Sequence, residues 1–62
     1  MDKCKVTNLG NGRTVDADVI QRNDKRLRVV LAGTNITINL SRDDVRKPYI
    51  GKTNGLEFSS MG

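Results

Sequence analysis

The chain has 62 residues with one tyrosine, one phenylalanine, no tryptophan and a formal charge of +4. A chain of this length has room for one small domain, so we expect residues 1–62 to form a single unit with a small core. Because the chain has no histidine and only one cysteine, it excludes histidine-based catalysis, an internal disulfide and the usual zinc sites.

The first predicted element is a hairpin around Asn11-Gly12, the residue pair preferred in a type I′ turn. With those two residues as the loop, the expected cross-strand pairs are Val6–Ala17, Cys4–Val19, Thr7–Asp16 and Lys5–Asp18. The first two pairs lie on the face that we expect to be buried, and the other two lie outside. Cross-strand pairing explains the two aspartates more simply than a bound cation does, so we expect no metal.

The joint after this hairpin is the least determined part of the sequence. Val19 and Val29 share the buried face only if the loop at residues 22–25 has an odd length or a strand carries a bulge. The sequence does not choose between the two.

The middle hairpin is the clearest element, because apolar residues alternate from Leu27 to Leu40. Gly33-Thr34 suits a two-residue type II′ loop. The expected pairs are then Leu27–Leu40, Val29–Ile38 and Leu31–Ile36, all on one buried face.

The segment after this hairpin predicts one short helical turn near residues 42–47. Ser41 can cap its first amides, and Asp44 three residues later resembles the acidic member of a capping box. Pro48 ends the turn, because proline disfavours helical geometry in the residue before it.

The last predicted element is a hairpin with Asn54-Gly55 as a type I′ loop. It places Lys52 opposite Glu57, and Phe58 opposite Gly51. Together the elements predict an all-β fold: a small antiparallel meander of five or six strands that closes into an SH3-like barrel or a bent sheet. Such a fold implies no particular function.

The positive charge is concentrated after residue 24, where seven cations stand against three carboxylates. Arg26 and Arg28 take outward positions of the middle hairpin, and Tyr49 could stack on a base. The candidate nucleic-acid-binding residues are Arg26, Arg28, Arg42, Arg46, Lys47 and Tyr49. We therefore expect a small basic domain that binds RNA or DNA without catalysis and without a cofactor.

The alternative is a protein-interaction or homodimerisation module. Ile20 and Val30 point outward in the expected register, and two exposed β-branched residues could form a protein interface. No leader or membrane-length apolar run is present, so we expect a cytoplasmic protein without a membrane partner.

Overall fold

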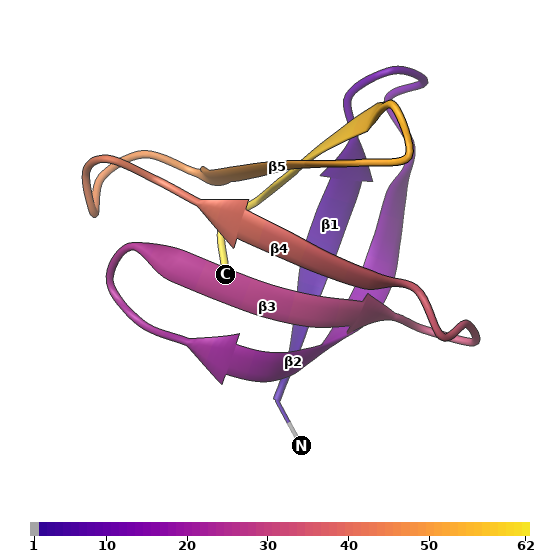
Figure 1. Cartoon of the computed structure of the whole chain (residues 1–62), viewed down its shortest axis with the longest axis horizontal. Coiled ribbons are helices and arrows are strands. Elements are labelled where there is room, and N and C mark those ends of the chain that lie inside the picture. The colour runs from indigo at the N-terminus through magenta and orange to yellow at the C-terminus, as the bar shows by residue number, and fades with distance from the viewer. Residues whose placement is uncertain (1) are drawn as a thin grey trace.

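A computed structural model describes residues 2–62 of the chain. Six strands follow one another: β1 (Lys3–Asn8), β2 (Thr14–Arg22), β3 (Arg26–Leu31), β4 (Thr37–Ser41), β5 (Tyr49–Thr53) and β6 (Leu56–Ser60). Each is antiparallel to the next, and β6 pairs with β1 to close the barrel (Figure 1). The predicted all-β barrel is therefore confirmed. Within residues 2–62, no helix is long and apolar enough to cross a membrane.

The core consists of side chains from alternate strand positions, as period-two patterning requires. Its buried members are Cys4, Val6, Ala17, Leu27, Val29, Ile38, Leu40, Tyr49 and Phe58, with Val19 and Leu31 packed against them. Each fully buried aliphatic side chain contributes about 1.5–3 kcal/mol. The seam between β1 and β6 is reinforced by buried Ser60, whose hydroxyl donates to Lys5 O at 2.6 Å.

The register of the middle hairpin is confirmed, with Leu27 opposite Leu40 and Val29 opposite Ile38. The turn differs from the predicted Gly33-Thr34 loop. Thr34 N–H donates to Leu31 O, so the turn is centred on Ala32 and Gly33. The expected burial of Ile36 is wrong. Its side chain is 42% exposed and lines a surface cleft together with Leu31 and Phe58.

The predicted register of the first hairpin is wrong by two residues: the observed pairs are Lys3–Asp18, Cys4–Ala17, Lys5–Asp16, Val6–Val15 and Thr7–Thr14. The loop is wider than Asn11-Gly12 alone, because Asn8 N–H donates to Arg13 O. The side chains of Asn8 and Asn11 accept backbone N–H groups inside the loop, which stabilises this wider turn. A shift of two residues preserves the faces, so Cys4 and Val6 still point inward.

A β-bulge resolves the undetermined joint between the first two hairpins. The β2–β3 register shifts between Val19 and Gln21, which leaves Ile20 as the extra residue. Val19 therefore pairs with Val29, as the buried face requires. In the loop that follows, the Asn23 side chain accepts hydrogen bonds from the backbone N–H groups of Lys25 and Arg26.

The helical turn expected near residues 42–47 is replaced by a single reverse turn, in which Lys47 N–H donates to Asp44 O. The Asp44 carboxylate accepts the Arg46 N–H at 2.9 Å and also the Arg46 guanidinium. This local bonding competes with helical capping. Asp44 thus closes its own turn and does not cap a helix.

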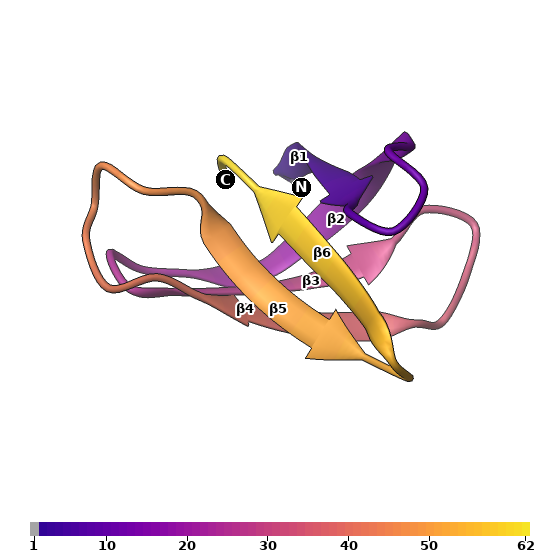
Figure 2. The ribbon, with the colours of Figure 1, turned by 90° about the horizontal axis from the view of Figure 1, so that it is seen from above.

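The last hairpin has the predicted register and turn, since Gly51 pairs with Phe58, and Asn54 and Gly55 both have positive φ. Between β4 and β5 the ladder has only one residue pair, Ser41–Ile50, and β5 crosses β4 obliquely (Figure 2). A Cβ atom on Gly51 would lie 2.3 Å from Asn39 O. Glycine at this position is therefore what allows the two strands to approach closely.

Candidate nucleic-acid interface

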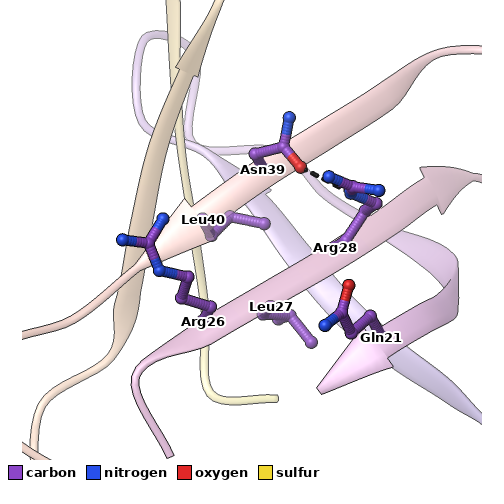
Figure 3. Close-up of a pocket in the computed structure, with 6 residues that line it drawn as sticks. All are labelled: Gln21, Arg26, Leu27, Arg28, Asn39 and Leu40. Carbon is purple, nitrogen blue, oxygen red and sulfur yellow. Dashed lines mark hydrogen bonds between the residues drawn. The ribbon is translucent and has the colours of Figure 1, made fainter. Parts of the chain in front are cut away.

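The outer face of β3 carries the two arginines that the sequence singles out. Strand register places Gln21, Arg28 and Asn39 in one row across β2, β3 and β4. Arg26 lies on the same face, two residues before Arg28 (Figure 3). These side chains line a shallow cleft of about 330 Å³ together with Leu27 and Leu40.

Hydrogen bonding orients Arg28. Its Nε donates to Asn39 Oδ1 at 2.8 Å, as the dashed line in Figure 3 marks. A guanidinium has five N–H donors, so the four on its terminal nitrogens remain for an acceptor in the cleft. Anchoring one edge of the group lowers the entropy lost when the others bind.

Neither Arg26 nor Arg28 forms an ion pair with another described residue. The ion pairs between described residues are Lys5–Asp16, Arg22–Asp2, Arg46–Asp44 and Lys52–Glu57. The positive charge on the β3 face is therefore not offset by a contacting carboxylate, and this face is suited to an anion.

Arg42, which is half-buried, and the buried ring of Tyr49 form a clamp between two loops. The Arg42 guanidinium lies 4.1 Å from the centre of the Tyr49 ring and donates to Asp24 O at 2.6 Å. The Tyr49 hydroxyl donates to Asn23 O at 2.6 Å, so the pair joins the β2–β3 loop to the segment between β4 and β5. Tyr49 is only 2% exposed, so the expectation that its ring stacks on a base is corrected. Its position is inward because it shares the strand face of Gly51, which lies opposite buried Phe58.

The two remaining cations that the sequence predicts for nucleic-acid binding, Arg46 and Lys47, differ in whether they are free to bind an anion. Arg46 is paired with Asp44, and the Arg46 side-chain and backbone hydrogen bonds hold the pKa of that carboxyl below its usual range. Lys47 is exposed and lines a second cleft beside Ser41. Because Ser41 pairs with Arg26, this cleft lies at the end of the β3 face, and Asp43 brings a carboxylate to it beside Lys47.

The two residues predicted for a protein interface differ in exposure. Ile20 is 55% exposed at the bulge, as expected. Val30 is half-buried and lies between Asp18 and Thr37 in the sheet. An interface at Ile20 and Val30 stays a prediction.

Sequence reasoning missed two polar residues of the cleft. Asn39 could have been predicted from the sequence, because the correctly predicted register places it opposite Arg28. Gln21 could not have been predicted, because its pairing with Arg28 depends on the bulge at Ile20.

Metal-ligating side chains do not cluster in the described part of the chain: no group of three or more cysteine, aspartate or glutamate residues is positioned to hold an ion. Comparisons of the chain with protein-family models, curated proteins and solved structures give no match. The function is therefore inferred from the geometry and charge of the site alone.

Proposed function

We propose that this domain binds nucleic acid, RNA or DNA, on the outer face of β3 and β4, and that it acts by binding and not by catalysis. The observation that carries the proposal is the pair Arg26 and Arg28, which line one cleft without a carboxylate partner. Phosphate oxygens are the acceptors that two adjacent guanidinium groups suit best.

In the proposed complex, the charged and the uncharged side chains of the cleft contact different parts of the nucleic acid. Arg26 and Arg28 bind the phosphate backbone, which sets affinity and salt dependence. Gln21 and Asn39 carry amide groups that can both donate and accept, so they can contact a base edge or a ribose. Because the one tyrosine and the one phenylalanine of the chain are both buried, base stacking on a ring plays no part. The proposed binding mode therefore recognises the backbone more than the sequence.

Fluorescence anisotropy tests the proposal with labelled oligonucleotides of about ten nucleotides, single- and double-stranded, of RNA and of DNA. Titrations at about 50 and about 200 mM salt measure the dependence of log K on log salt. The wild type should bind, and binding should weaken as salt rises. No binding, or binding insensitive to salt, would refute the proposal.

A matched pair of variants separates a site from general charge. Arg26→Gln with Arg28→Gln removes two positive charges from the cleft. Lys3→Gln with Arg13→Gln removes two exposed charges elsewhere that, like those of the cleft, belong to none of the ion pairs between described residues. If both arginines bind phosphates, the first variant should lower the magnitude of the salt slope by about 0.7–0.9 for each phosphate that is no longer neutralised. The second variant should keep the wild-type slope. Equal weakening in both variants would show that net charge, and not this cleft, is responsible.

A further inference from the structure

The two arginines of the β3 face reach toward opposite ends of their cleft (Figure 3). The Arg28 guanidinium lies beside Asn39, to which its Nε donates at 2.8 Å, whereas the Arg26 guanidinium lies on the other side of Leu40 in this view. Arg26 and Arg28 are also two residues apart on one strand, which separates their Cα atoms by about 7 Å. The two groups are therefore placed for two separate anions and not for one shared phosphate.

This arrangement matches the repeat of a nucleic-acid strand. Consecutive phosphates of an extended single strand lie about as far apart as alternate residues of a β-strand. A strand that runs along β3 can thus place one phosphate at Arg26 and the next at Arg28. Because both arginines lie on one line, they follow one backbone and not the two backbones that border a groove of a duplex.

Beyond Arg28 the outer face of the sheet is no longer positively charged. The next outward residue of β3 is half-buried Val30, and Asp18 lies beside it on β2. Lys3 of β1 pairs with Asp18 on its other side, so the two charges at this end of the face have opposite signs. A third phosphate next to Arg28 would meet the Asp18 carboxylate, and like charges brought together in this way oppose binding.

The other end of the face, at Arg26, borders cations that hold two loops together. The Lys25 ammonium donates to Asp43 O at 2.6 Å. The Arg42 guanidinium belongs to the clamp, and Lys47 shares its cleft with the Asp43 carboxylate. A phosphate at this end would compete with these contacts. The positive charge that is open to phosphate is therefore concentrated on the two arginines of β3.

We propose, on the basis of the nucleic-acid function proposed above, that the site binds one single strand along β3 and contacts only two consecutive phosphates. Arg26 binds one phosphate and Arg28 the next. The amides of Gln21 and Asn39, which flank Arg28 in the sheet, contact the sugar or base beside the second phosphate. Asp18 is the boundary residue that keeps a third phosphate out.

Amide NMR titrations with oligothymidylates that end in hydroxyl groups test this footprint. At about 150 mM salt, distant phosphates are screened. The affinity should rise at least about threefold from the dinucleotide, which has one phosphate, to the trinucleotide, which has two. From the trinucleotide to a strand of ten nucleotides it should rise by no more than about eightfold, because the longer strand offers about eight pairs of consecutive phosphates.

The possible failures of these titrations are distinguishable. A larger rise with length would mean further phosphate contacts and would overturn the two-phosphate footprint, while nucleic-acid binding itself would stand. A duplex of ten base pairs that binds more tightly than the single strand would overturn the assignment to one strand. No binding of the ten-nucleotide strand even at low salt would refute the proposed function, and this inference with it.

The boundary at Asp18 is tested by two variants with the same change of net charge. Asp18→Asn should strengthen binding of the ten-nucleotide strand at least about twofold, because a third phosphate can then lie beside Arg28. The gain for the trinucleotide should be smaller. Glu57→Gln is the control, since it removes a carboxylate of β6. Equal gains in the two variants, or no gain in Asp18→Asn, would overturn the role of Asp18.

Discussion

Replacement of Gly51 by alanine perturbs the closest approach between two strands of the barrel. The added Cβ would lie 2.3 Å from Asn39 O and 3.1 Å from Leu40 Cα. These are backbone atoms, so they cannot move aside as the end of a side chain can. Overpacking of this kind costs about 1–3 kcal/mol, whereas alanine recovers about 0.4–1 kcal/mol because it restricts the unfolded chain. The clash should win, because 2.3 Å is far inside the contact distance of a carbon and an oxygen and the opposing atoms belong to the backbone.

We therefore expect Gly51→Ala to lower the free energy of unfolding by about 1–2 kcal/mol, or about 4–16 °C in Tm for a domain of this size. Thermal and urea unfolding followed by circular dichroism measure this change. Gly10→Ala is the control, since its Cβ would meet only the Asn8 side chain, at 3.2 Å. It should stay within about 0.5 kcal/mol of wild type. A Gly51→Ala protein as stable as wild type would refute the reasoning that this close approach requires glycine.

Three further predictions concern the core, the clamp and the surface. Ile38→Ala should cost about 2–5 kcal/mol in unfolding experiments, because Ile38 is fully buried, whereas Ile36→Ala should cost less than about 1 kcal/mol; similar losses at both would contradict the observed end of the core. Tyr49→Phe leaves a loop carbonyl without its donor and should cost about 1–3 kcal/mol by urea titration, and an unchanged midpoint would mean that the hydroxyl bond does not hold the loop. A hydrogen bond from Lys5 lowers the pKa of Asp16 from its usual 3.8, so the stability from this pair is present above pH 3.8 and lost as pH falls through the lower folded value. Asp16→Asn should lose less stability on acidification than wild type does. An identical dependence of the free energy of unfolding on pH in both proteins would exclude this cause.

The register of the middle hairpin follows from its apolar alternation, although its turn differs from the prediction, and the register of the last hairpin follows from its turn chemistry. Asn54-Gly55 determines the register of the last hairpin, because both residues take the positive φ that a two-residue type I′ loop requires. Around Asn11-Gly12 the same chemistry fails, because Asn8 and Asn11 bond to the loop backbone and widen it. Local side-chain bonds of this kind are not visible in an alternation pattern.

The candidate site was predictable to the extent that it depends on strand parity. Arg26 and Arg28 follow directly from the alternation of β3. The same parity places Tyr49 inside, since Tyr49, Gly51 and Phe58 share one face, but its proximity to cations in the sequence suggested an exposed ring. The contact between Arg42 and Tyr49 depends on how two loops meet, which no local pattern specifies.

Binding of nucleic acid to the β3 face is tested most directly by an amide NMR titration of the wild type with a single-stranded oligonucleotide of about ten nucleotides. We predict that the largest shifts are at Arg26, Arg28 and Asn39 and at the side-chain amide of Gln21. Shifts confined to β1 and β6, or no shifts at low salt, would contradict the proposed interface.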